Sequence, residues 1–255
     1  MGRIGLMVPS SNTTVEPEFY RALPRGVTLH TARLYLTRIA PESILKMVED
    51  MENQAKLLAS ADVDVIVLGA TAPSFLNGLG YDRELIQKIE SATGRKATTT
   101  STALVEAIRH LGAKRVVLGS AYDEKVNGIA RAFLVASGVE VLDMKGLSLV
   151  DNLVVGRLPS SSAYDLALEV DHADADAIVL SCTNWQTMDA IEDIERATGK
   201  PVISTTQASI WAALRAIGHA EPVPGYGRLL RELATESLAQ GPLAQDPPAT
   251  DSQPA

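Results

Sequence analysis

Short apolar runs alternate with longer amphipathic segments along most of the chain. Short, β-rich apolar runs bounded by polar turn residues are typical of strands buried in a parallel sheet. We expect strands at residues 3–8, 27–32, 63–68, 97–99, 114–119, 139–142 and 177–180, and another within 200–207. The segments between them favour helices, which we expect at residues 15–23, 41–60, 82–93, 103–111, 122–137, 163–171 and 206–218.

This alternation of strands and helices predicts the α/β fold class, with a parallel sheet in each half. We expect two Rossmann-like, flavodoxin-like lobes related by pseudo-two-fold symmetry, with the active site in the cleft between them. The first lobe spans about residues 1–112 and the second about 113–205, and a returning segment at about 206–235 joins the first lobe. The tail at residues 241–255 is rich in Pro, Gln and Ala, which predicts disorder.

One stretch of the sequence occurs twice, and this repeat supports two related lobes. The sequence VDVIVLGAT at residues 63–71 returns as ADAIVLSCT at residues 175–183, and IESATG returns downstream as IERATG. A Thr-rich turn and a helix-like segment follow in both copies. Superimposing the copies places Ala70 opposite Cys182, so the two halves differ in one side chain that could carry chemistry.

Composition and charge exclude several classes of partner and cofactor. The chain has 255 residues and a net charge of -8, which argues against nucleic acid or an anionic membrane as partner. No apolar run approaches the length of about 18 residues that a membrane span needs. The single cysteine excludes an internal disulfide and fits a cytoplasmic location. The histidines lack ligand spacing and no phosphate-binding loop is present, so we expect no metal, nucleotide or other cofactor.

Polar turns follow several of the predicted strands at the same end. They lie at residues 10–14, 70–71, 120–122 and 181–184, each at the carboxyl end of a predicted strand. Open α/β sheets bind their ligands at this edge, and facing lobes would bring all four turns to one cleft. Helix capping by Ser, Thr and Asn is the alternative explanation for any one of these turns.

Cys182 is the candidate with the most specific chemistry, because it is the only cysteine in the chain. A free cysteine is often a small buried hydrophobe, but its place at a strand end before Thr and Asn indicates a reactive position at a helix N-terminus. A thiol with its ordinary pKa of about 8.5 is a competent proton donor at neutral pH. A helix dipole would instead favour the thiolate, and the sequence leaves both states open.

Four motifs resemble a known group of enzymes. PSSNTTVEPE at residues 9–18 and SCTN at residues 181–184 resemble motifs of maleate isomerases. SAY at residues 120–122, with Val126 and Asn127 after it, and PGYGR at residues 224–228 are similar to arylmalonate decarboxylases. Over about residues 3–235 the chain therefore resembles the aspartate/glutamate racemase superfamily, in the branch of maleate cis-trans isomerases and arylmalonate decarboxylases.

The resemblance implies a role for Cys182 and for the position opposite it. Most members of the superfamily use two facing cysteines, one from each lobe, whereas Ala70 occupies the first position here. Arylmalonate decarboxylases also lack the first cysteine, and one proton donor suffices because loss of carbon dioxide creates the carbanion without a base. Cys182 is thus the expected catalytic residue, and the expected substrate-binding residues are Asn12, Ala70, Thr71, Tyr122, Asn152 and Thr183.

These binding residues resemble two different sites. Thr71 and Tyr122 resemble hydroxyls that hold the retained carboxylate in decarboxylases. Asn12 and Asn152 resemble the carboxylate-binding asparagines of maleate isomerases, although Asn152 lies in a predicted loop where a turn-forming role is the alternative.

The Ala70 side of the predicted cleft differs from the decarboxylase pattern in one donor. Ala72 stands where decarboxylases commonly have a serine. Whether the Ser74 hydroxyl takes the place of that serine is left open by the sequence. We expect the remaining wall on this side to be apolar, formed by Leu68, Pro73 and Leu76.

Three functions remain open from the sequence. The first is a cofactor-free decarboxylase of a malonate-type acid, in which Cys182 protonates an enediolate. The second is a maleate cis-trans isomerase-like enzyme, altered or inactivated at Ala70, and the third is a non-catalytic dicarboxylate-binding protein. Each predicts a small carboxylic or dicarboxylic acid as ligand, and a homo-oligomer is compatible with all three.

Overall fold

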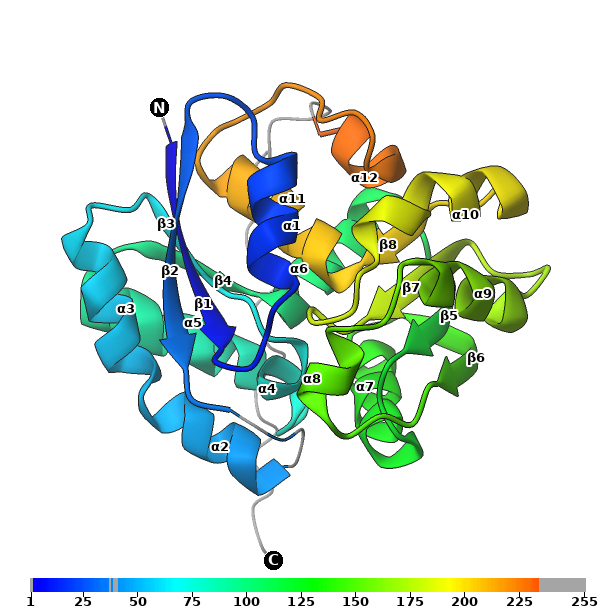
Figure 1. The fold of residues 1–255 in the computed structure, drawn as a ribbon, viewed down its shortest axis with the longest axis horizontal. Coiled ribbons are helices and arrows are strands. Elements are labelled where there is room, and N and C mark those ends of the chain that lie inside the picture. The colour runs from blue at the N-terminus through cyan, green and yellow to red at the C-terminus, as the bar shows by residue number, and fades with distance from the viewer. Residues whose placement is uncertain (1, 37, 39–40, 234–255) are drawn as a thin grey trace, which may run out of the picture.

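Two four-stranded parallel sheets form the framework of the protein (Figure 1). A computed structural model describes residues 2–36, 38 and 41–233. The first sheet has the order β2-β1-β3-β4 and the second has the order β6-β5-β7-β8. The strands are β1 (Gly2–Pro9), β2 (Val27–Leu34), β3 (Val65–Leu68), β4 (Lys96–Thr99), β5 (Arg115–Ser120), β6 (Glu140–Gly146), β7 (Ala177–Ser181) and β8 (Val202–Ser204).

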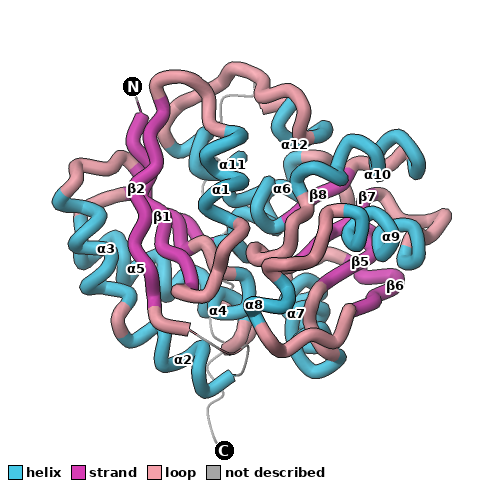
Figure 2. Tube along the Cα trace, viewed as in Figure 1, coloured by secondary structure: helices cyan, strands magenta, loops and turns pink. Residues whose placement is uncertain are grey.

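Helices flank both sheets (Figure 2). In the first half of the chain they are α1 (Val15–Ala22), α2 (Pro41–Glu49), α3 (Met51–Ser60), α4 (Thr71–Phe75), α5 (Tyr81–Thr93) and α6 (Thr100–His110). In the second half they are α7 (Glu124–Ala136), α8 (Asn152–Val155), α9 (Ser161–Val170), the 3-10 helix η1 (Met188–Ala190), α10 (Ile191–Thr198), α11 (Thr205–Ala216) and α12 (Gly227–Arg231). In the described residues, no helix is both long and apolar enough to cross a membrane.

The matching strand orders confirm the predicted α/β fold of two similar lobes. β3 and β7 occupy the same place in their sheets, and they carry the two copies of the sequence repeat. In a doubly wound sheet the carboxyl ends of such strands bind ligands. The fold therefore places the turn after Leu68 and the turn after Ser181 at equivalent edges of the two lobes.

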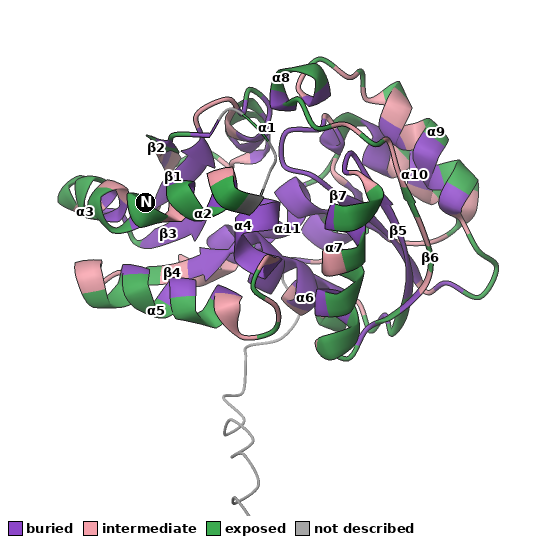
Figure 3. Ribbon diagram, turned by 90° about the horizontal axis from the view of Figure 1, so that it is seen from below, coloured by how far each residue is buried: buried purple, intermediate pink, exposed green. Residues whose placement is uncertain are grey.

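Helix α11 packs between the two halves of the molecule. It contacts helix α6 and strands β3 and β4 in the first half of the chain, and strand β8 of the second sheet. The Ser209 hydroxyl on α11 donates to the Thr100 hydroxyl at the start of α6, with 3.1 Å between the oxygens. Buried residues fill the centre of the molecule around α11 and α4, while α3, α5 and α10 present exposed outer faces (Figure 3).

The segment expected as one helix at residues 41–60 is divided at Asp50. Asp50 has φ and ψ of -90° and 0°, which ends α2 and lets α3 begin at the next residue. Its carboxylate accepts hydrogen bonds from the side chains of Asn53 and Gln54 in the first turn of α3. The apolar spacing continues across this break, so the periodicity alone could not reveal it.

Two other expectations have different outcomes. Asn152, expected in a loop, instead begins the short helix α8. The tail predicted to be disordered, residues 241–255, and the end of the returning segment lie outside the described residues.

Two glycines provide a test of this packing. A Cβ atom at Gly146 would lie 2.2 Å from the Tyr122 carbonyl oxygen, whereas a Cβ at Gly128 within α7 would have no atom within 4 Å. We expect Gly146→Ala to destabilise the protein by about 1–3 kcal/mol because the backbone must shift. Gly128→Ala should stabilise it by about 0.5–1 kcal/mol, because alanine loses less conformational entropy in a helix. Urea unfolding of both variants measures this, and equal stability of the Gly146→Ala protein and the wild type would contradict the packing.

Candidate active site

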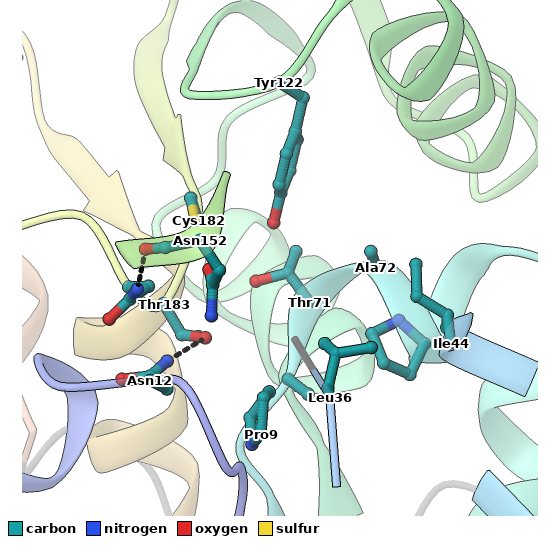
Figure 4. Close-up of a pocket in the computed structure, with 13 residues that line it drawn as sticks. Pro9, Asn12, Leu36, Ile44, Thr71, Ala72, Tyr122, Asn152, Cys182 and Thr183 are labelled. Carbon is teal, nitrogen blue, oxygen red and sulfur yellow. Dashed lines mark hydrogen bonds between the residues drawn. The ribbon is translucent and has the colours of Figure 1, made fainter. Parts of the chain in front are cut away.

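A pocket lies between the two lobes at the carboxyl ends of their strands (Figure 4). It contains about 340 Å³ of space, including the part that is open to solvent. All of the residues singled out as catalytic or substrate-binding line it: Asn12, Ala70, Thr71, Tyr122, Asn152, Cys182 and Thr183. The structure therefore brings together side chains from turns that are far apart in the sequence.

One side of the pocket is apolar, and the sequence predicted it only in part. Its walls are Pro9, Leu36, Ile44, Ala72 and Pro73. Of these, Pro9, Leu36, Ile44 and Ala72 gather on the side away from Cys182 (Figure 4). Leu36 follows β2 and Ile44 lies on α2, in a part of the sequence where no motif indicated the site.

Two of the three expected apolar walls are wrong. Pro73 lines the pocket, but Leu68 and Leu76 do not. Leu68 is fully buried within β3 as part of the core, and Leu76 packs against that core from the end of α4. Strand and helix geometry turns both side chains away from the pocket, a direction that the sequence spacing did not fix.

Cys182 follows directly after β7 and is almost entirely buried, with 4% of its surface exposed. Its backbone N–H donates to the hydroxyl of Thr205, the first residue of α11. This bond connects the end of β7 to the end of β8. Burial raises the pKa of the Cys182 thiol to about 11, and polar groups of Asn184, Tyr122 and Trp185 offset part of this rise.

The expected helix N-terminus at Cys182 is wrong. Residues 182–187 form turns and irregular backbone, and the next helical residue is Met188. Cys182 therefore does not begin a helix of its own, and burial keeps the proton on the thiol at neutral pH. The short helix α4 begins instead at Thr71 in the other lobe, where Ala70 is the N-cap residue.

Two hydroxyl groups of the pocket come from different lobes: that of Thr71 lies next to Ala70, and that of Tyr122 comes from the other lobe. The Tyr122 hydroxyl ends near the Thr71 hydroxyl (Figure 4), and both residues are buried. Burial, together with the nearby Cys182, raises the pKa of Tyr122 well above its ordinary value, while Thr71 partly offsets this rise. Thr71 Oγ1 lies near Tyr122 but forms no hydrogen bond of ordinary distance and angle. A buried hydroxyl of this kind in a pocket is a group that a bound carboxylate could satisfy.

Asn12 has a structural role as well as a place in the pocket. Its Oδ1 accepts from the backbone N–H groups of Thr14 and Val15, at 2.9 and 3.0 Å, where α1 begins. Its Nδ2 donates to the Thr183 hydroxyl, which in turn donates to the Gly69 carbonyl oxygen, each at 3.3 Å. The capping explanation is therefore correct for Asn12, and the only hydroxyl proton of Thr183 is already used.

Asn152 lines the pocket and is held by residues of both lobes. Its Nδ2 donates to the Ser11 hydroxyl over 2.8 Å, and its carbonyl oxygen accepts from Asn184 Nδ2 over 2.6 Å. Asn184 Oδ1 also accepts from the Thr13 backbone N–H. Asn184 lines the pocket too, and its position two residues after the cysteine was the sequence signal that could have identified it.

No cationic side chain lines the pocket. Among its lining residues there is no Lys, Arg or His, so any anion there would be held by neutral hydrogen-bond donors. Ser74 does not supply a further donor, because it is absent from the lining and its hydroxyl hydrogen-bonds Ser101. Within the described parts of the chain, no group of three His, Cys, Asp or Glu side chains is arranged to hold a metal ion.

Comparison with known proteins places this site among related enzymes. The profile of the family described as arylmalonate decarboxylase matches residues 4–230. The arylmalonate decarboxylase of Bordetella bronchiseptica is 33% identical over 232 residues, which cover 90% of this chain and 96% of the relative. The structure of a maleate isomerase variant from Pseudomonas putida S16 with maleate has a TM-score of 0.88 and 30% identity, covering 91% of this chain and 98% of the other.

A second solved structure adds a chemical detail. It is a cysteine-to-serine variant of the maleate isomerase of Nocardia farcinica, with a covalently bound succinylcysteine intermediate. Its TM-score is 0.86 at 30% identity, covering 90% of this chain and 98% of the other. Sequence identity is similar for decarboxylase and isomerase relatives, so it does not decide between the two reactions.

The protonated state of Cys182 predicts its reactivity. In the native protein, the rate of alkylation by iodoacetamide should stay low across neutral pH and rise only as the pH approaches about 11. In urea, the rate should rise around the ordinary thiol pKa of about 8.5.

The same shift predicts how stability depends on pH. The unfolded state loses the thiol proton first, so the free energy of unfolding should fall between the ordinary pKa and about 11. This contribution should be missing in Cys182→Ser, whose hydroxyl does not titrate in that range. An alkylation profile with the same midpoint in native and unfolded protein would show that burial does not hold the proton on the thiol.

Proposed function

Because the chain belongs to the arylmalonate decarboxylase family, we propose that it is a cofactor-free decarboxylase of a malonate-type acid, in which Cys182 is the proton donor. One observation carries this proposal. The only cysteine of the chain lies in the pocket, while Ala70 occupies the matching position of the other lobe. A methyl group can neither add to a double bond nor transfer a proton, so the site has one acid and no second thiol.

The proposed reaction begins with one carboxylate held at the polar side of the pocket. Thr71 and Tyr122 supply hydroxyl donors, and the Asn12 amide has a second N–H that its bond to Thr183 leaves available. Such donors stabilise the negative charge that grows on the retained carboxylate as the enediolate forms. Thr183 positions Asn12 and Gly69, because its own proton is donated to Gly69.

The second carboxylate would lie against the apolar side, near Ala70 and Pro73. There it lacks hydrogen-bond donors, which favours its loss as carbon dioxide. The electron pair of the broken carbon–carbon bond passes to the α-carbon and the retained carboxylate. The α-carbon then takes the proton of the Cys182 thiol, and the thiolate regains a proton from solvent once product leaves.

The apolar lining also supports a class of substrate. Leu36 and Ile44 face the pocket with no polar group between them and Pro9 (Figure 4). An aryl or alkyl substituent on the α-carbon would bury apolar surface there, whereas a second charged arm would be desolvated without a partner. We therefore place malonates with one apolar substituent ahead of unsubstituted dicarboxylates.

Maleate isomerisation is the second candidate, and the positions of Asn12 and Asn152 in the pocket favour it. The covalent succinylcysteine in the Nocardia farcinica variant, in which one cysteine is already replaced, requires a second cysteine in that enzyme. This chain has one cysteine, and its raised thiol pKa disfavours the thiolate that would attack a double bond. A protein that binds dicarboxylates without converting them is the third alternative.

A panel of substrates tests these functions against one another. We expect carbon dioxide release from aryl- and alkylmalonates, and no conversion of maleate to fumarate. Cys182→Ala should lower the decarboxylation rate by a factor of about 100 to 10,000, the usual contribution of a general acid. Thr71→Val, which keeps the shape but removes the hydroxyl, should lower turnover about 100-fold.

Several results of this panel would overturn the proposal. Maleate isomerisation without decarboxylation would establish the second candidate, and binding without conversion would establish the third. A Cys182→Ala protein with wild-type decarboxylase activity would exclude the thiol as the donor.

Ala70, opposite the thiol, gives a separate prediction. Ala70→Cys places a second thiol on the other face of the bound carbanion, and racemase-like or isomerase-like activity should then appear. Ala70→Ser is the matched control, because its hydroxyl has similar size but a much higher pKa. Product chirality and maleate conversion measure the outcome, and an Ala70→Cys protein with unchanged products would show that the two positions do not face the same substrate atom.

A further inference from the structure

The buried carboxylate of Glu18 contacts the segment that follows Cys182 and takes no part in the reaction proposed above. Glu18, on α1 in the motif at residues 9–18, is only 1% exposed. Its Oε1 accepts the backbone N–H groups of Thr187 and Met188, at 3.1 and 3.2 Å. Glu18 belongs to the first half of the chain and these N–H groups follow Cys182 in the second, so one carboxylate connects the two halves behind the site.

Three buried oxygen atoms of this region lie near one another but form no hydrogen bond of ordinary distance and angle. They are Oε2 of Glu18 and the hydroxyl oxygens of Thr187 and Thr206. Thr206 follows Thr205, whose hydroxyl accepts the Cys182 N–H, so this polar cluster adjoins the residues that hold the cysteine. Buried oxygens without partners are usually satisfied by a proton or an internal water. The two hydroxyls can donate to an ionised Oε2, and a proton on Oε2 can donate to either hydroxyl, so the cluster can accommodate both states of Glu18.

Three titratable groups of the described residues interact electrostatically with Glu18: Arg21 on the same helix, Tyr226 before α12, and the Cys182 thiol. Asp189 of η1 acts on Arg21 and Tyr226. Arg21 and Asp189 form an ion pair with each other at 2.9 Å, and both are about half exposed. Burial raises the pKa of Glu18 to about 7, and the N–H groups of Met188 and Thr187, the Thr206 hydroxyl and Arg21 offset part of the rise.

We propose that Glu18 is a positioning residue for Cys182, which holds the loop after the cysteine and, through its own ionisation, sets how readily the thiol releases its proton. This role rests on the proposed use of Cys182 as the proton donor. It goes beyond a simple helix cap, because a cap that stays ionised would stabilise the start of η1 but would not change state near neutral pH.

The direction of the effect follows from the charge. An ionised Glu18 raises the pKa of the Cys182 thiol, because a second negative charge nearby disfavours the thiolate. Cys182 is then a weaker acid when Glu18 is ionised than when it is neutral. Proton transfer to the carbanion should slow as the pH rises through the titration of Glu18.

Nuclear magnetic resonance of the single cysteine tests this coupling without substrate. In protein labelled with ¹³C at cysteine Cβ, one resonance should report Cys182, with a small step in chemical shift near pH 7 before the thiol titrates. Glu18→Gln should remove that step, since the amide accepts the same N–H groups but does not ionise. Glu192→Gln is the matched control, because Glu192 is a partly exposed glutamate at the start of α10. The Cys182 resonance of that variant should keep the step near pH 7.

A second variant keeps the test independent of whether Glu18→Gln folds. Thr206→Val removes the hydroxyl that favours ionised Glu18, so the step should move to higher pH. A step that persists in Glu18→Gln, stays at the same pH in Thr206→Val, or is absent from the wild type would overturn the proposal.

Kinetics supply the functional arm of the same test. The fall in kcat near pH 7 should disappear in Glu18→Gln while KM changes little, because Glu18 does not touch substrate. If no malonate is decarboxylated but the step behaves as expected, the proposed function fails and the coupling stands. If decarboxylation occurs with the same pH profile in wild type and Glu18→Gln, the coupling fails and the proposed function stands.

Discussion

The side-chain amide of Asn184 joins the two halves of the pocket. Its oxygen accepts the Thr13 N–H from the turn after β1, and its nitrogen donates to the Asn152 carbonyl at the start of α8. The approach is close enough that a Cβ atom at Gly156 would lie 2.5 Å from the Thr13 hydroxyl and 3.1 Å from Asn184 Nδ2. This amide and the missing side chain at Gly156 let the strand ends of the two lobes approach closely, and the arrangement of the site depends on that approach.

Close approach of the lobes removes water from the groups between them. The thiol of Cys182 keeps its proton because its anion would be poorly solvated, and the Tyr122 hydroxyl stays protonated for the same reason. A pocket lined by neutral donors and no cation can orient a carboxylate while leaving its charge free to delocalise. Burial thus keeps the cysteine in its protonated form, the form that a single-cysteine site needs in order to donate a proton.

Much of the site was predictable because the internal repeat compares the protein with itself. The copies VDVIVLGAT and ADAIVLSCT identified equivalent strands and placed Ala70 opposite Cys182. Turns at strand ends then identified residues that the structure does bring into one pocket. The apolar wall was not predictable in full, because side-chain direction after β2 and within β3 depends on packing between distant segments. Leu36 and Ile44 were missed for this reason, and Leu68 was wrongly included.

Glu18 was missed for a different reason. Its motif was recognised, but a glutamate near a helix start ordinarily lies in solvent, and only the fold shows that this one is buried between the halves. The break at Asp50 was hidden in the same way by a continuous apolar pattern. Periodicity describes one element at a time, whereas these features arise where elements meet.

The central claim is that one thiol protonates one face of the carbanion, and the stereochemistry of protonation measures it most directly. Decarboxylation of a prochiral, singly substituted malonate can be run in D₂O, with deuterium content and chirality of the product determined together. The account predicts one deuterium at the α-carbon and a single enantiomer, because Cys182 approaches from one side and Ala70 offers no donor on the other. A racemic deuterated product, formed under conditions in which the product itself does not racemise, would contradict it.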